Sequence, residues 1–180
     1  IVATSEGNSN KVYALSNYGL GKKVIILTDD PVSPTFETID LPYAGSTIVL
    51  LGNGGFAVPA ENYVLLFNSS LEAVATIECE PVADYCFPVW AIDDPDDKKL
   101  YVAQGIVNAL SPHIWEIDYS GIPTVEVISM ESFYGNFALD SAGDRLYVPL
   151  PALGRIVEVN LGTKTKRNIN TPGVPVFCSI

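Results

Sequence analysis

One short phrase recurs four times along this chain, and the spacing of its copies constrains the fold more than any other feature. The copies read KVYALS, GFAVPA, KLYVAQ and RLYVPL. They begin at residues 11, 55, 99 and 145, which are 44, 44 and 46 residues apart. A repeat of about 44 residues is typical of one four-stranded blade of a β-propeller.

Three further extended segments accompany each copy. One follows it (VIILT, VLLFN, IWEID, IVEVN), a second comes after a turn, and a third precedes it. Each unit therefore holds four short strands joined by turn residues. A single four-stranded sheet cannot bury both of its faces, whereas radial stacking of such sheets can. A β-sandwich is the competing architecture, but it does not require four matching repeats. We therefore predict an all-β chain, a β-propeller with about four four-stranded blades.

The repeat also sets the expected blade boundaries. They are residues 1–45, 46–88, 89–135 and 136–173, with inner strands near Ile1–Glu6, Thr47–Leu51, Val89–Asp93 and Asn136–Asp140. Residues 174–180 look like the start of a further inner strand, although they could also pad the seam of a closed ring. Closed propellers with only four blades are rare. We therefore expect part of a six- or seven-bladed ring, with the remaining blades in missing sequence or in another chain.

Composition and short motifs limit the binding partners that the chain can have and the cellular compartment in which it is expected. The net charge is −11, with 10 basic against 21 acidic residues, which argues against a nucleic-acid partner. No apolar stretch reaches the roughly 20 residues that span a bilayer. Cys79 and Cys86 could form a local disulfide or remain buried thiols, and Asn68 begins a glycosylation sequon. These features point to an extracellular or secretory location; the alternative is a soluble cytoplasmic protein.

The segments IDDPDDKKLYVAQ and LDSAGDRLYVPL resemble blades of the NHL, YVTN and senescence-marker (gluconolactonase) propellers. In those blades an Asp ends the inner strand and the second strand reads Leu-Tyr-Val. We assign that position to Asp93, to Asp140 and, in the first unit, to Glu6, while Leu50 occupies it in the second. In gluconolactonase-type propellers an early Glu holds a divalent metal. The resemblance therefore implies that Glu6 is a candidate ligand for a metal such as Ca²⁺; otherwise no cofactor is expected.

A small-molecule ligand is expected at one mouth of the central channel. The loops predicted to form that mouth are rich in aromatic residues, whereas the opposite turns are short and charged. His113 is the only histidine, so it is the candidate for catalytic acid–base chemistry. The predicted substrate-binding residues, which supply aromatic walls and polar anchors, are Tyr18, Tyr85, Gln104, Asn108, Tyr134 and Arg155.

Two classes of function remain open. The first is a small-molecule enzyme, either a lactonase-type hydrolase or a lyase or cyclase. The second is a non-catalytic extracellular propeller that engages protein or glycan. The sequence contains no Gly-x-Ser-x-Gly elbow and no His-Glu-x-x-His motif, so no motif selects a reaction. The aromatic mouth loops favour the enzyme.

Overall fold

The computed structural model of the chain describes residues 2–6, 9–17, 21–30, 32–78, 87–105, 113–131, 136–140 and 142–171. These residues form four antiparallel sheets, each of four consecutive strands. Blade 1 contains β1 (Val2–Glu6), β2 (Ser9–Ser16), β3 (Lys23–Asp29) and β4 (Thr35–Asp40). Blade 2 contains β5 (Val49–Leu50), β6 (Phe56–Ala60), β7 (Tyr63–Phe67) and β8 (Ala73–Glu78). Blade 3 contains β9 (Phe87–Asp94), β10 (Lys99–Gly105), β11 (His113–Asp118) and β12 (Thr124–Ser129). Blade 4 contains β13 (Ala138–Leu139), β14 (Arg145–Leu150), β15 (Arg155–Asn160) and β16 (Lys166–Asn170).

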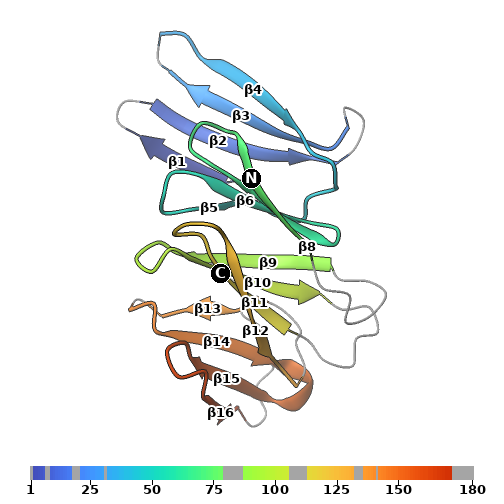
Figure 1. Ribbon diagram of the computed structural model, residues 1–180, viewed down its shortest axis with the longest axis vertical. Coiled ribbons are helices and arrows are strands. Elements are labelled where there is room, and N and C mark those ends of the chain that lie inside the picture. The colour runs from blue at the N-terminus through green and yellow to red at the C-terminus, as the bar shows by residue number, and fades with distance from the viewer. Residues whose placement is uncertain are drawn as a thin grey trace.

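The predicted all-β propeller architecture is confirmed. Apart from one 3-10 turn at Pro151–Leu153, the described residues contain no helix, and accordingly none that could cross a membrane. The four sheets stack face to face in chain order, and blades 1 and 4 lie at opposite ends of the stack (Figure 1). Over the described part of the chain the sheets therefore do not close into a ring, as expected for part of a propeller.

Alternating side chains bury both faces of the inner blades. On β11, Ile114 packs in the core shared with blade 4, whereas Trp115 and Ile117 pack in the core shared with blade 2. This alternation follows from the two-residue period of a strand. We call the face toward the next blade in chain order the forward face, and the other the backward face. In β7, which is apolar along its length, Val64 and Leu66 point forward and Leu65 and Phe67 point backward.

The strand register corrects one alignment made from the sequence. In blade 3, Lys99 lies opposite Asp94. The equivalent of Lys99 in blade 4 is Arg145, and its backbone carbonyl accepts a hydrogen bond from the backbone N–H of Asp140. Asp94, not Asp93, is therefore the equivalent of Asp140. In blade 1 the equivalent of Lys99 is Lys11, which pairs with Thr4, so Glu6 lies two residues beyond this position. The misalignment in blade 3 arose because two consecutive aspartates, Asp93 and Asp94, end its inner strand, and the first was matched to Asp140.

A buried carboxylate joins blades 3 and 4. The side chain of Glu116 on β11 is only 5% exposed. Its carboxylate accepts a hydrogen bond of 2.7 Å from Lys99 Nζ in its own blade. It also forms an ion pair with Lys164, which lies in the turn between β15 and β16. Lys164 also lies 3.7 Å from the exposed carboxylate of Glu126. The same contact with Glu116 raises the pKa of Lys99. A buried charge is tolerated only when it is paired in this way.

Replacing Glu116 with glutamine is expected to lower the free energy of unfolding by about 3 kcal/mol, because breaking a buried ion pair leaves its partners uncompensated. Urea unfolding followed by circular dichroism measures the loss. The matched control is Glu126→Gln, which removes the exposed carboxylate beside the same lysine and should change stability by less than about 0.5 kcal/mol. Equal losses in the two variants would show that Glu116 does not hold the blades together.

Candidate functional site

The first residue of the third strand occupies the same place in all four blades. The register makes Lys23, Tyr63, His113 and Arg155 equivalent. The residue that follows each of them is apolar and β-branched: Val24, Val64, Ile114 and Ile156. The position next to the rim is thus apolar in every blade, whereas the end facing the predicted mouth carries four different polar side chains. Different polar residues at equivalent places on one rim of a repeated scaffold are typical of a binding surface.

Blades 1 and 2 contribute an aromatic and charged group to this rim. The rings of Tyr43 and Tyr63 stack with centroids 4.0 Å apart and planes 16° from parallel. Their hydrogen bond and the nearby Glu78 raise the pKa of Tyr63 to about 12. Glu61 accepts bonds from Lys22 Nζ at 2.8 Å and from Ala44 N at 3.0 Å, which lower its pKa. None of these residues is among the predicted site residues, although Tyr43 and Glu61 lie in two of the predicted mouth loops, Leu41–Gly45 and Pro59–Asn62.

Two of the predicted site residues, His113 and Arg155, lie at this rim with described side chains. His113 begins β11 opposite Ser129, and its Nδ1 atom is buried without a hydrogen-bond partner among the described residues. Burial lowers the pKa of this imidazole. Arg155 begins β15 and pairs with Glu131 of blade 3, while its Nε atom is buried and finds no partner in the part of the chain that the structure describes. Both residues belong to third strands, two strands outward from the inner strand. At about 4.8 Å per strand, that is about 10 Å from the inner strand.

The remaining predicted site residues are not brought together among the described residues. Tyr18, Tyr85, Asn108 and Tyr134 lie outside them, as do all three cysteines. Gln104 lies on β10, where only its backbone is described. Glu6 forms the last pair of the β1–β2 hairpin, with Ser9. That hairpin is at the end of the blade opposite to His113 and Arg155, so the metal prediction and the mouth prediction concern different places.

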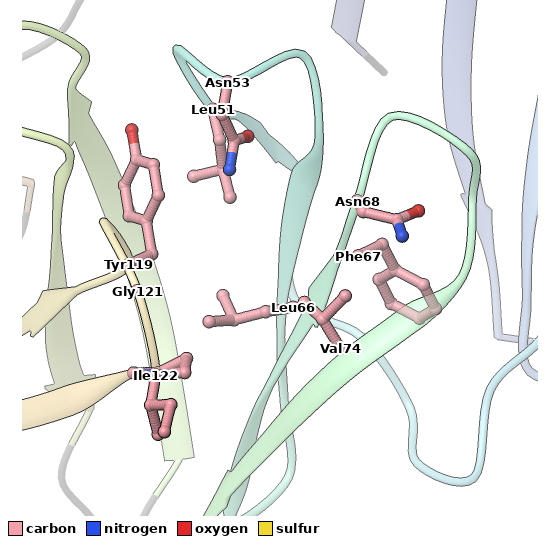
Figure 2. Close-up of a pocket in the computed structure, with 10 residues that line it drawn as sticks. Leu51, Asn53, Leu66, Phe67, Asn68, Val74, Tyr119, Gly121 and Ile122 are labelled. Carbon is pink, nitrogen blue, oxygen red and sulfur yellow. The ribbon is translucent and has the colours of Figure 1, made fainter.

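A groove that sequence analysis missed lies at that opposite end, between blades 2 and 3. Its volume is about 410 Å³. Figure 2 shows Leu66 directed into the space between the two blades, with Tyr119 and Ile122 on the other side. Val74 and Ile122 are 54% and 93% exposed beside it. Because the groove forms between turns of two different repeats, no single segment of sequence signals it.

Hydrogen bonds to Asp93 fix one wall of this groove. Tyr119 Oη donates to the Asp93 carboxylate at 2.6 Å, and Gly52 N of blade 2 donates to the same carboxylate at 2.8 Å. Burial is the main cause that raises the pKa of Asp93. Asp93 therefore joins the turns of two blades. The described residues contain no group of three or more His, Cys, Asp or Glu side chains that could hold a metal ion. A divalent metal in the channel stays a prediction.

Comparison with known proteins was informative only at the level of structure. No family model matches the chain, and no curated protein matches its sequence. Dihydro-heme d1 dehydrogenase NirN, solved with DHE, matches with a TM-score of 0.68 and 16% identity over 93% of this chain. A catalytically inactive virginiamycin B lyase from Staphylococcus aureus with quinupristin gives 0.59 and 13% over 96%. A putative 6-phosphogluconolactonase from Bacteroides uniformis gives 0.56 and 17% over 92%.

These likenesses concern a part of each neighbour. The chain covers 36% of NirN, 59% of the lyase and 57% of the phosphogluconolactonase-like protein. At such low identity they establish the fold and nothing finer. Together with the four stacked sheets, they show that this chain has a β-propeller fold.

Proposed function

We propose that this propeller binds a small organic molecule at the mouth and acts on it as a lactonase-type hydrolase or as a lyase or cyclase. The observation that carries the proposal is the rim of Lys23, Tyr63, His113 and Arg155, four different polar residues at equivalent places at the start of the third strands. Propellers with this fold include a lyase and a putative lactonase, which is consistent with the proposal.

In the hydrolase version, His113 acts as the general base. Its neutral imidazole takes a proton from water, and the water oxygen attacks the lactone carbonyl. The ring C–O bond then breaks, and the leaving oxygen receives the proton from the imidazolium. Arg155 stabilises the negative charge that develops on the carbonyl oxygen. Because both residues lie on third strands, the substrate would sit toward the outer loops rather than on the axis of the channel.

A specific observation favours the second class of function, a non-catalytic propeller that engages protein or glycan. Val74 and Ile122 are exposed apolar side chains beside the groove between blades 2 and 3. Exposed apolar residues around a groove are typical of interaction sites. Such a propeller would use the end of the blades opposite to the mouth.

A turnover and binding screen separates the two classes. The chain is incubated with sugar lactones and aryl lactones while proton release is recorded, and each compound is also tested for its effect on the melting temperature. If the chain is a lactonase, at least one lactone should be turned over faster than in buffer alone and should raise the melting temperature of the protein. The absence of turnover, together with an unchanged melting temperature across the panel, would refute the lactonase proposal.

A further inference from the structure

The groove between blades 2 and 3 has a buried apolar floor and two exposed apolar lips. Leu51 and Leu66 of blade 2 and Tyr119 of blade 3 line its floor, and they are 6%, 1% and 7% exposed. Val74 of blade 2 and Ile122 of blade 3 form the lips, and they are 54% and 93% exposed. Because the two lips belong to different blades (Figure 2), a molecule that lies between them contacts both blades. Burial of the lips is favourable at about 25 cal/mol per Å².

The wall of the groove on the side of blade 3 is held in place by contacts with blade 2. The hydroxyl of Tyr119 donates to Asp93 at 2.6 Å and accepts a hydrogen bond from Gly52 N at 3.2 Å. Gly52 also lies directly against Pro95 of blade 3, since a Cβ atom at this glycine would come within 2.5 Å of Pro95 Cβ. A site with walls that are already fixed loses less free energy to ordering when it binds a ligand.

The lining of the groove carries no charge. Among the described residues, the ten that line it include no acidic or basic side chain, although the whole chain has 10 basic and 21 acidic residues. The nearby carboxylate of Asp93 is already bonded to Tyr119 and to Gly52 N. An ion in the groove would lose its hydration without gaining a counter-charge. A ligand that matches this lining is therefore electrically neutral.

The amide side chains in the lining leave a hydrogen-bond donor free. Asn68 Oδ1 accepts bonds from Ser70 N and Glu72 N, and Asn68 Nδ2 donates to the Glu72 carboxylate. Asn53 Oδ1 accepts a bond from Gly55 N at 3.0 Å, whereas Asn53 Nδ2 donates to no group in the described part of the chain. Figure 2 shows this nitrogen directed toward the space between the blades. A matching ligand therefore presents a hydrogen-bond acceptor.

From these observations we propose that the groove is a small-molecule site separate from the mouth, and that its ligand is a neutral aromatic molecule with a carbonyl or ether oxygen. The ring lies between the lips formed by Val74 and Ile122, and the oxygen accepts a hydrogen bond from Asn53 Nδ2. The groove volume of about 410 Å³ is within the range of small-molecule sites. The proposal is independent of lactonase activity, because the groove and the rim lie at opposite ends of the blades.

Binding of the fluorescent dye Prodan, a neutral aromatic ketone without a lactone, tests this proposal. Titration of the chain into Prodan should shift the dye emission to the blue with a Kd of about 10–100 μM, because the dye enters an apolar site. Asn53→Asp should weaken binding about tenfold, since it replaces the donor and keeps the oxygen that accepts from Gly55 N. Ile122→Ser and Val74→Ser should each weaken binding about three- to tenfold.

The matched control is Val32→Ser. Val32 is 90% exposed and occupies in blade 1 the turn position that Ile122 has in blade 3. It does not line the groove, so this variant should bind Prodan with an unchanged Kd. Equal affinity of Ile122→Ser and the natural chain, or a Kd above about 1 mM for the natural chain, would overturn the proposal.

Competition among three naphthalene derivatives tests the chemistry of the ligand. Acetylnaphthalene, a neutral ketone, should displace Prodan, whereas the anion naphthoate and the cation naphthylethylammonium should compete at least about tenfold more weakly. Displacement by either ion as effectively as by the ketone would contradict a neutral ligand. A dimer that binds no Prodan and is lost in Ile122→Ser, as measured by light scattering, would also overturn the proposal, because the lips would then contact a second copy of the chain.

Discussion

Replacing His113 with alanine is expected to lower turnover of the true substrate by about 10²–10⁴-fold, the usual contribution of a general base. The imidazole has no hydrogen-bond partner at Nδ1 among the described residues, so it is not committed to a structural bond at that atom. Its loss should therefore affect the reaction more than the fold. Steady-state kinetics of the variant on a lactone found by screening measures the effect.

The pH profile distinguishes a base from a merely structural histidine. Burial lowers the pKa of His113, so the neutral, proton-accepting form persists below the ordinary value near 6.5. The ratio kcat/KM should thus begin to decline at a lower pH than it would with an ordinary imidazole as the base. Added imidazole should restore part of the activity of His113→Ala. The exposed Glu126, three residues along β12 from Ser129, the partner of His113, offers a control, because Glu126→Gln should leave turnover unchanged. Full activity in His113→Ala would remove the catalytic role.

Replacing Phe56 with alanine is expected to lower the free energy of unfolding by about 3–5 kcal/mol, the cost of a large cavity in a packed core. Phe56 is fully buried between blades 1 and 2. Its ring stacks on Phe67 with centroids 4.6 Å apart and contacts Tyr13 at 5.3 Å. Small domains have a total stability of about 5–15 kcal/mol, so this one change would remove a large part of it.

Denaturant titration checks the Phe56 prediction against Ile122→Ala, which removes a side chain that is 93% exposed and should cost less than about 0.5 kcal/mol. A loss below about 1 kcal/mol for Phe56→Ala would show that the seam between blades 1 and 2 repacks around the cavity. It would also mean that the stacked pair with Phe67 adds little to the cohesion of the two blades.

The fold could be predicted from sequence because each blade repeats the same apolar strands. Position-by-position matching succeeded along the third strands, where Val24, Val64, Ile114 and Ile156 align without gaps. It failed for Asp93 because blade 3 has two consecutive aspartates where blade 4 has Asp140 alone, and the register selects the second of them, Asp94. The repeat therefore predicts strands well and the residues at their ends less well.

The candidate site could be predicted only in part. His113 was predicted from composition alone, because it is the single histidine of the chain. Its place at the rim is known only from the register of β11. Tyr63 and Glu61 were missed because their relevance depends on Tyr43 and Lys22, from the preceding blade. The groove lined by Leu66 and Ile122 was missed for the same reason. Contacts between repeats depend on how blades stack, which the pattern within one repeat does not encode.

The ion pair between blades 3 and 4 limits which repeat units such a chain can lose. Deletion of blade 3 would place the Lys164 turn over Leu66 and Ala75, and a cation would then cover an apolar surface that offers no counter-ion. Duplication of blade 4 would instead place the second Lys164 over Glu158, the equivalent of Glu116, so the new seam would keep its acid. Loss of blade 3 would therefore need a compensating substitution in blade 2 or blade 4, whereas gain of a second blade 4 would not.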